Sequence, residues 1–432
     1  MTPGRTLFRD VLLVPSTPDG ARPFVGWLRT AGRRIAALGP GTPPAGDDDR
    51  VIDGPDRVLI PGLVNAHAHS HSSLTRGSAE GLPLEQWLRV IESEQSRLTE
   101  EQAYHAALAT YCEVLLSGTA SIADMCLFPA AAMRAAREVG IRAVVVPYVA
   151  DTKPFTPKLE LTERLLAEGA HDGGRVRTWV GLHDLESCSD DQVRAGVALA
   201  IRYGVGLHLH CAETRFSVER TVRRTGRHPV AHLAHLGALS ERTLLAHCVW
   251  VDEAERRTLR GAGVHVTHCP QANLKLGSGI APVPELLATG VNVALGTDGA
   301  KANNSLDMFE AMKFASLIQK GSRQDPAVLP PEQVLAMATR NGARALQIPA
   351  GSLAPGMLAD LTLVRLDRFH LQPVSPETIT TNLVHAARGS DVDLVMVDGK
   401  IIVAGGAVQT VDAPAIRTRA AAIGASLLAP HP

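Results

Sequence analysis

The sequence is poor in several features that would point to particular classes of protein. Aromatic residues make up only 4% of its 432 residues, and 43 basic residues nearly balance 44 acidic ones. The formal net charge of −1 gives no reason to expect a nucleic acid or a membrane surface as a partner. No run of eighteen apolar residues occurs, so we expect no transmembrane helix. Residues 1–10 also lack the uninterrupted apolar core of a signal peptide.

Cysteine is scarce and scattered. None of the six cysteines forms a Cys-x-x-Cys pair, and in a chain of this length that pattern predicts reduced, mostly buried thiols in a cytoplasmic protein. The six are Cys112, Cys126, Cys188, Cys211, Cys248 and Cys269. The unusual feature of the composition is histidine, which occurs seventeen times.

The hydrophobic pattern changes twice along the chain. Residues 6–60 alternate short apolar runs with glycine and proline, which predicts short antiparallel strands. From Arg57, strand-like runs alternate with helical patterns of ten to eighteen residues. The predicted strands are 58–67, 119–125, 141–149, 176–183, 205–210, 243–247, 264–267 and 291–296. Helical patterns cover 100–117, 129–139, 189–203, 252–262, 305–320 and 331–346.

This alternation predicts an α/β fold. Eight strands, each followed by a helix, favour a parallel (β/α)8 TIM barrel over residues 61–350 rather than an open doubly wound sheet. After Gly351 the pattern returns to short strands, and an Ala-rich stretch, 413–429, predicts a terminal helix. Two flanking β segments are most economically one small domain. We therefore expect residues 1–60 and 351–432 to form a composite β-sandwich domain built from both termini.

Residues that bind metals fall at the ends of the predicted strands. His67 and His69 close the first strand and point the same way, because side chains alternate along a strand. The ends of later strands carry His183, His208, His210, His247 and Asp298. Since the carboxyl ends of barrel strands meet at one face, these positions predict a metal site there. Three histidines and one aspartate around one ion would leave a position open for water, whose pKa the ion lowers to about 7.

Five motifs resemble those of the amidohydrolase superfamily. They are Pro61-Gly-Leu-Val-Asn-Ala-His-Ala-His69, His210-Cys-Ala-Glu-Thr214, Ala246-His-Cys-Val249, Asn273-Leu-Lys-Leu-Gly-Ser-Gly-Ile-Ala-Pro282 and Gly296-Thr-Asp-Gly299. The branch they most resemble contains the methylthioadenosine/S-adenosylhomocysteine deaminases and the s-triazine hydrolases. The likeness covers nearly the whole chain, although its motifs are poor guides to the substrate.

This resemblance implies a ligand set of His67, His69, His210 and Asp298 around one Zn²⁺ per subunit, with iron used by some relatives. His183 stands where relatives with two metals place a carboxylated lysine, so we expect a single ion. The resemblance also implies a homodimer or homotetramer that acts on a small heterocyclic substrate.

It further implies roles for the remaining site residues. Glu213 would pass a proton to a ring nitrogen, and His247 would hydrogen-bond the hydroxide and the developing oxyanion. Asp298, both ligand and base, would take the hydroxide proton and hand it to the departing amine. The expected substrate-binding residues are His183, Gln95, Glu213 and Asn304.

His71 could line the pocket. His208 shares a strand face with His210, but the His-x-x-Glu pattern selects His210 as the ligand.

The chain departs from the nucleoside deaminases of this branch at three places in the expected pocket. Gln95 or Glu94 stands where a ribose-binding glutamate is usual, and Pro147 stands near the place of a missing arginine. Asp184-Leu185 replaces the Ser-Pro that usually follows His183, and Glu186 comes next. None of these changes affects the expected ligands, so we expect the same hydrolytic chemistry on an altered substrate.

The favoured function is hydrolytic deamination of an amino-substituted N-heterocycle: an adenosine-derived thioether, a purine or pyrimidine base, or a triazine. The alternative is hydrolytic removal of chloride, alkylamine or an imino group from a triazine or formimino compound. A barrel that binds ligand without turnover is disfavoured, because no expected ligand is missing and Glu213 is present.

Overall fold

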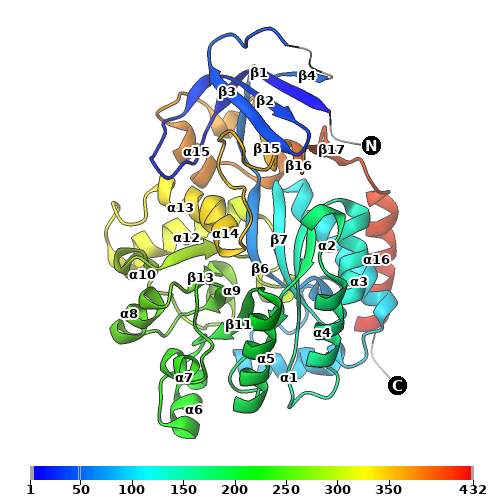
Figure 1. Cartoon of the computed structure of the whole chain (residues 1–432), viewed down its shortest axis with the longest axis vertical. Helices are drawn as coiled ribbons and strands as arrows, with labels where there is room; N and C mark the ends of the chain where they lie inside the picture. Colours follow the sequence, from blue (N-terminus) through cyan, green and yellow to red (C-terminus); the bar gives the residue numbers. More distant parts are fainter. Residues whose placement is uncertain (1–3, 47, 49, 430–432) are drawn as a thin grey trace.

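The computed structural model describes residues 4–46, 48 and 50–429. Its strands form three sheets, one made from the two ends of the chain and two made from the middle. Figure 1 shows the terminal sheet at one end of the molecule and the helices of the middle region beside the parallel strands. The site described below depends on how the two central sheets meet.

The terminal sheet has nine strands in the order β18-β17-β16-β15-β5-β1-β2-β3, with β4 paired to β1. The first five are β1 (Arg5–Leu13), β2 (Phe24–Ala31), β3 (Arg34–Pro40), β4 (Arg50–Asp53) and β5 (Arg57–Pro61). The last four are β15 (Leu361–Arg365), β16 (Val392–Val397), β17 (Lys400–Ala404) and β18 (Ala407–Val408). Strands β4 and β5 both run parallel to β1, so the purely antiparallel arrangement predicted for residues 6–60 is wrong for these two strands.

The strand predicted over 58–67 is two strands that belong to different sheets. Strand β5 pairs with β15, whereas β6 (Leu63–Ala68) pairs with β7. The change of partner falls at Gly62, whose N–H donates to the Asp360 carbonyl at 2.8 Å. A Cβ atom at position 62 would lie 2.4 Å from the Cβ of Ala120, so only glycine fits this crossing.

The two central sheets are parallel. One contains β6, β7 (Thr119–Cys126), β8 (Arg142–Pro147) and β9 (Val176–Thr178). The other contains β10 (Val180–Gly181), β11 (Leu207–Cys211), β12 (Thr243–His247), β13 (His265–His268) and β14 (Asn292–Leu295). These strands match the eight predicted runs, except that β6 covers only the second half of 58–67 and the run 176–183 is divided at Trp179.

The sheets approach each other at both edges. At one edge, the Trp179 N–H donates to the Val145 carbonyl of β8, and the Val180 N–H donates to the Gly206 carbonyl beside β11, both at 3.0 Å. At the other edge, the Asp298 N–H donates to the His67 carbonyl at 2.9 Å. This second contact joins two residues of the predicted metal set directly through the backbone.

Helices follow the strands as predicted. They are α1 (Leu84–Gln95), α2 (Glu100–Leu116), α3 (Pro129–Val139), α4 (Leu159–Glu168), α5 (Asp190–Tyr203), α6 (Arg215–Thr225), α7 (Pro229–His235), α8 (Glu253–Gly261), α9 (Pro270–Lys275), α10 (Val283–Thr289), α11 (Ala300–Asn303), α12 (Met308–Arg323), α13 (Pro331–Ala338), α14 (Arg340–Ala345), α15 (Ile379–His385) and α16 (Ala413–Leu428). A short 3₁₀ helix, η1 (Ser70–Thr75), follows β6. The helix predicted over 331–346 breaks at Thr339, whose backbone is not helical.

Within the part of the chain that the structure describes, no helix combines the length and apolar character needed to cross a bilayer. All six cysteines are free and buried, which confirms the predicted burial of these side chains. The strands β6–β8 are buried along their whole length. Polar residues at their ends are therefore held in a rigid apolar frame.

Candidate metal centre

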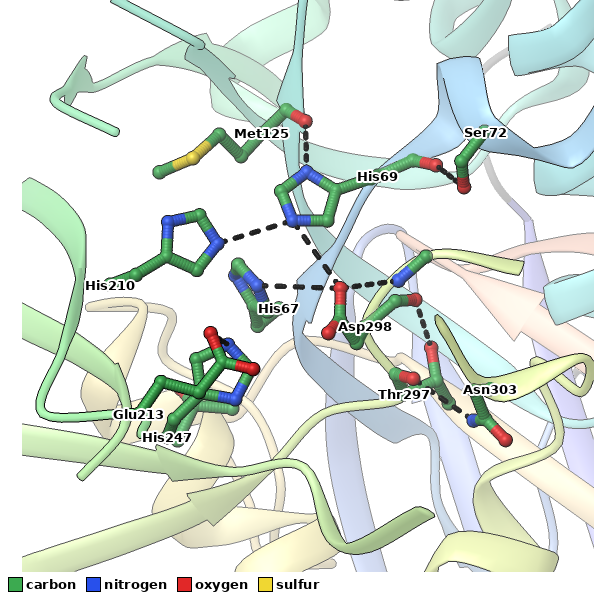
Figure 2. Close-up of polar contacts among 12 residues, drawn as sticks. His67, His69, Ser72, Met125, His210, Glu213, His247, Thr297, Asp298 and Asn303 are labelled. Carbon is green, nitrogen blue, oxygen red and sulfur yellow. Dashed lines mark hydrogen bonds and ion pairs between the residues drawn. The ribbon is translucent and has the colours of Figure 1, made fainter. Parts of the chain in front are cut away.

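The structure brings His67, His69, His210 and Asp298 together at the carboxyl ends of their strands. His67 lies in β6, His69 just after it, His210 in β11, and Asp298 just after β14. The ring centroid of His67 is 4.7 Å from that of His69 and 4.9 Å from that of His210. Figure 2 shows the imidazoles of His67 and His69 facing the Asp298 carboxylate, with His210 facing His69. Residues more than 200 positions apart in the sequence thus form one cluster.

The potential ligand atoms are close enough to share one ion. The His69 Nε2 atom is 3.3 Å from both the His210 Nε2 and the Asp298 Oδ1, and the His67 Nε2 is 3.8 Å from Asp298 Oδ1. His67 belongs to two overlapping groups whose ligand atoms lie within 4.8 Å of one another: one with His69 and Asp298, the other with His210 and His247. Nitrogen and carboxylate oxygen are ligands that suit zinc.

Hydrogen bonds fix the tautomers of two of these imidazoles. The His69 Nδ1–H donates to the Met125 carbonyl at 2.7 Å, and the His210 Nδ1–H donates to the His183 carbonyl at 2.6 Å. A neutral imidazole that donates from Nδ1 carries its lone pair on Nε2. Both lone pairs are therefore available to the shared space, as is usual for metal-binding histidines.

His67 provides the strongest indication that this cluster takes a cation. Its side chain is completely buried, and its Nε2 finds no hydrogen-bond partner among the described residues. Burial, reinforced by the neighbouring imidazoles, holds the pKa of His67 well below its usual value, so the ring is neutral and Nε2 can act as a lone-pair donor. A buried polar atom without a partner is costly, and an ion bound here would satisfy it. The residues present fit a divalent metal.

Glu213 and His247 lie beside the cluster, as Figure 2 shows. The Glu213 Oε2 atom is 3.6 Å from His247 Nε2, and its Oε1 accepts a hydrogen bond from Ser278 Oγ at 3.2 Å. Burial raises the pKa of Glu213 despite the opposing effect of His247. The His247 ring is oriented through Nδ1, which lies 2.9 Å from Asn273 Oδ1. The arrangement places a carboxyl group with a raised pKa next to an oriented imidazole.

Two of these residues have an unusual backbone. His247 has a φ of 72° and Asp298 a φ of 61°, in the left-handed region that residues other than glycine rarely adopt. Such conformations cost roughly 1–3 kcal/mol each and persist where the surroundings impose them. In both cases the strand ends at or just before the residue, and the turn directs its side chain toward the cluster.

A cavity opens above the cluster. Its lining includes the predicted residues His69, His183, His210, Glu213, His247 and Asp298, together with His71, Gln95, Trp87, Tyr148, Glu85, Asp184, Leu185 and Glu186. His67 lies beneath this lining. His183 donates from Nδ1 to Asp184 Oδ2 at 2.7 Å, and its ring packs on Tyr148 at a centroid distance of 4.2 Å. The replacement at Asp184 therefore orients His183.

The structure also shows which of Glu94 and Gln95 faces the cavity. Gln95 lines the cavity and its Nε2 lies 3.0 Å from His71 Nε2, whereas Glu94 forms an ion pair with the buried Lys301. Gln95 is therefore the residue that can reach a substrate. Its Oε1 and the Trp87 Nε1 are buried without a hydrogen-bond partner among the described residues, which leaves two polar groups for a ligand to satisfy.

Two predicted pocket positions lie elsewhere. Asn304 is exposed, and its Oδ1 accepts a hydrogen bond from Lys275 Nζ at 2.5 Å, so the structure does not bring it to the cavity. Pro147 is buried at the end of β8, and the neighbouring Tyr148 forms the cavity wall instead. Both predictions relied on sequence position alone. In the structure the Asn304 side chain contacts Lys275, and Pro147 is buried within its strand.

Several residues that position the site were not predicted. Asn65 joins β6 to the Asp298 turn: its Nδ2 donates to Thr297 Oγ1 at 2.7 Å, and its Oδ1 accepts from the Thr297 N–H at 3.1 Å. Asn273 and Ser278 orient His247 and Glu213. All three fall inside the quoted motifs, so the motifs marked them without revealing their roles.

Comparison with known proteins agrees with this geometry. The family model described as "Amidohydrolase family" matches residues 58–402. The chain belongs to the amidohydrolase family.

Two relatives and one solved structure are similar to the chain over most of its length. The chain is 42% identical over 420 residues to a 5-methylthioadenosine/S-adenosylhomocysteine deaminase of Moorella thermoacetica, covering 96% of this chain and 97% of that protein. It is also 42% identical over 389 residues to a 5'-deoxyadenosine deaminase of Methanothermobacter thermautotrophicus, covering 88% and 90%. A crystal structure of an adenosine deaminase from Xanthomonas campestris with bound zinc superposes with a TM-score of 0.92 at 28% identity, covering 99% of each chain. The resemblance drawn from the sequence motifs is confirmed.

Proposed function

We propose that this protein is a metal-dependent aminohydrolase that removes the amino group from an adenine-type ring of an adenosine derivative. The observation that carries the proposal is the convergence of three imidazoles and a carboxylate beneath a cavity, with Glu213 beside them. The relatives described above are named for deaminating adenosine-derived compounds, which supports the same reaction here.

His67, His69, His210 and Asp298 would hold one zinc ion, with iron as the alternative metal. Such an ion lowers the pKa of a bound water from 15.7 to about 7 and so supplies hydroxide at neutral pH. The zinc-bound structure of the Xanthomonas campestris deaminase supports zinc.

The chain's own groups would move the protons. Glu213, whose pKa burial raises, would donate a proton to a ring nitrogen, which makes the adjacent carbon electrophilic. His247 presents Nε2 toward the site, and with a proton on both ring nitrogens it would donate to the attacking oxygen and stabilise the charge that develops there. The Asp298 carboxylate accepts a proton from the nucleophile and returns it to the departing amine. His183 and Gln95 would bind the substrate from the cavity wall.

The ionisable residues that line the cavity affect which substrates can bind. Apart from histidines, the ionisable residues among its described lining are all acidic: Glu85, Asp184, Glu186, Glu213 and Asp298. A substrate with an uncharged 5'-substituent would meet no repulsion there, whereas a 5'-substituent with a net negative charge would approach like charges. We therefore expect methylthioadenosine and 5'-deoxyadenosine to be better substrates than adenosine 5'-monophosphate.

Steady-state assays would test this function. The zinc-loaded protein should release ammonia from methylthioadenosine, 5'-deoxyadenosine or adenosine, and metal analysis should find about one ion per chain. Efficient turnover of these nucleosides would remove the altered-substrate idea raised by Gln95 and Asp184. Chloride or alkylamine release from a triazine, without ammonia release from any nucleoside, would favour the alternative hydrolysis, which needs the same metal and Glu213. A metal-free protein, or one with no turnover on the whole panel, would contradict the proposal.

The proposal extends to architecture and setting. The two parallel sheets would form one closed (β/α)8 barrel over residues 61–350, which the contacts at both sheet edges support. Residues 1–60 and 351–432 would form a composite β-sandwich around the apolar cluster that includes Phe8, Leu28 and Leu361. We also propose that the protein is a cytoplasmic homodimer or homotetramer. Free, buried cysteines support the cytoplasmic location.

A further inference from the structure

His208 lies next to the metal cluster without belonging to it. It sits on β11, two residues before His210 and on the same face, and it is completely buried. Its Nδ1 is 2.8 Å from the Leu244 carbonyl oxygen, and its Nε2 is 2.8 Å from the Nδ1 of His67. Both ring nitrogens are thus engaged, and neither is free to coordinate an ion.

These two contacts determine where the protons lie. A carbonyl oxygen can only accept, so the His208 Nδ1 carries a hydrogen and donates it to Leu244. In neutral His208 the Nε2 then holds a lone pair, so the hydrogen between the two rings must come from the His67 Nδ1. A neutral His67 with its hydrogen on Nδ1 has its lone pair on Nε2. That Nε2 is the buried atom with no partner among the described residues, 3.8 Å from Asp298 Oδ1.

We propose that His208 is a positioning residue, which holds His67 in the one tautomer and ring orientation that can bind the metal. The inference rests on the proposed metal site. His69 and His210 donate to backbone carbonyls, which substitution cannot remove. His67 instead donates to a side chain, so its support is the one among these three imidazoles that a point mutation can test.

The chemistry predicts the size of the effect. Groups that hydrogen-bond a ligating histidine raise its basicity and fix its orientation, and their loss costs about 10- to 100-fold in metal affinity. Without His208, the His67 ring could place its hydrogen on Nε2 or rotate, and either change removes a ligand from the cluster. A purely structural His208 would leave the metal affinity unchanged once the protein is folded.

The test is the zinc affinity of two variants. His208→Leu removes the acceptor, whereas His208→Gln keeps a side-chain oxygen that can accept from the His67 Nδ1–H and an amide N–H that can donate. Each full-length protein is stripped of metal, checked for folding by circular dichroism and titrated with zinc against a chromophoric chelator. We expect His208→Leu to bind zinc about 10- to 100-fold more weakly than wild type, and His208→Gln to stay within a few-fold of wild type.

His265 provides a matched control. It is a buried histidine at the beginning of β13, and its Nδ1 contacts Asn292 rather than a residue of the cluster. His265→Leu should bind zinc like wild type. Equal weakening in His208→Leu and His208→Gln would overturn the hydrogen-bond role, as would wild-type affinity in His208→Leu. If His208→Leu does not fold, His208→Phe, which keeps a ring but lacks the acceptor for the His67 Nδ1–H, takes its place with the same expectation. If the wild-type protein itself binds no zinc, the proposed function fails instead.

Discussion

At the scale of single residues, Glu213 is a carboxyl group that its surroundings push toward the protonated form. Replacing it by glutamine keeps the shape and the contact to Ser278 but removes the transferable proton. We expect Glu213→Gln to retain zinc at the wild-type ratio and to lose about 100- to 10,000-fold in kcat, the usual range for a general acid–base group. Metal analysis and steady-state ammonia release measure the two effects. Glu219→Gln, an exposed glutamate on α6, serves as the control and should behave like wild type. Full activity of Glu213→Gln would refute the proton-transfer role.

Glu186 at the cavity wall gives a pH-dependent prediction. Burial raises its pKa to about 7, above its ordinary value, and Asp184 adds to the effect. A raised carboxyl pKa favours the folded state below the unfolded pKa, and that contribution is lost as the pH rises through about 7. Compared with wild type, Glu186→Gln should therefore become progressively more stable between about pH 4.5 and 7, by at most about 3 kcal/mol. Urea unfolding of metal-free proteins measures the difference. A difference that does not change with pH would contradict it.

Some residues of the site could be predicted from sequence motifs, and others could not. The four clustered residues were predictable because they lie at or just after the carboxyl ends of parallel strands, and those ends meet at one edge of a sheet. The position of Asn304 was not predictable, because its side chain is engaged by Lys275, which lies 29 residues away in the sequence. The His67–His208 contact also joins positions 141 residues apart, and no local pattern specifies such a pair.

At the scale of the elements, Gly181 on β10 marks a close approach of two strands. A Cβ atom there would lie 2.0 Å from the Pro147 carbonyl oxygen and 2.5 Å from a methyl group of Val146, both on β8. We expect Gly181→Ala to destabilise the protein by about 1–3 kcal/mol, the usual cost of overpacking. It should also weaken activity, because β10 leads directly to His183. The midpoint of urea unfolding and the specific activity measure these effects.

Gly321 on α12 is the control for that substitution. A Cβ atom at this position would meet nothing within 4 Å, and alanine is favoured over glycine in a helix by about 0.5–1 kcal/mol. Gly321→Ala should therefore leave activity unchanged and stabilise the fold slightly. If both substitutions had the same effect on stability, the close approach at Gly181 would not be the cause.

Most elements were predictable because their periodicity is strong. The helix over 129–139 has the predicted bounds, and Gly140 ends it with a left-handed backbone, as expected of a helix C-cap. The errors fall where tertiary packing divides a continuous apolar run. Residues 58–67 were one strand by pattern, yet the crowding at Gly62 makes the chain cross from one sheet to another. The hydrophobic pattern indicates which residues are buried. Because both strands are buried, the pattern could not show where one ends and the other begins.

At the scale of the whole molecule, a buried ionic cluster joins the terminal sheet to the central region. Arg142, at the start of β8, forms two hydrogen bonds to Asp360, with Nε–Oδ2 at 2.6 Å and Nη2–Oδ1 at 3.0 Å. Its Nη2 also lies 3.0 Å from Asp398 Oδ1, in the turn between β16 and β17. The side chains of Arg142 and Asp360 are almost completely inaccessible. The sequence did not predict this junction, because it depends on charges 218 and 256 residues apart.

Such a cluster need not stabilise the protein, because desolvating the charges offsets their attraction. Breaking it is different: Asp360→Leu would leave the buried Arg142 guanidinium with Asp398 as its remaining carboxylate partner in the cluster. Removing one member of a buried pair typically costs about 3–5 kcal/mol, so we expect Asp360→Leu to lose about 3 kcal/mol in the free energy of unfolding. The double variant Arg142→Met/Asp360→Leu removes both charges. It should lose clearly less than the single variant, although Asp398 keeps Arg33 as a partner.

A double-mutant cycle with the four proteins separates these contributions. Urea unfolding of the metal-free proteins gives the stabilities, and zinc titration shows whether the distant metal site is affected. Because the cluster lies at the amino end of β8, opposite the strand ends that carry the metal ligands, we expect the zinc affinity of all four proteins to agree within a few-fold. Losses that simply add in the double variant would mean that Arg142 and Asp360 stabilise the fold independently. A weakened zinc site would instead mean that the terminal sheet holds the parallel strands in the register that the proposed metal site requires.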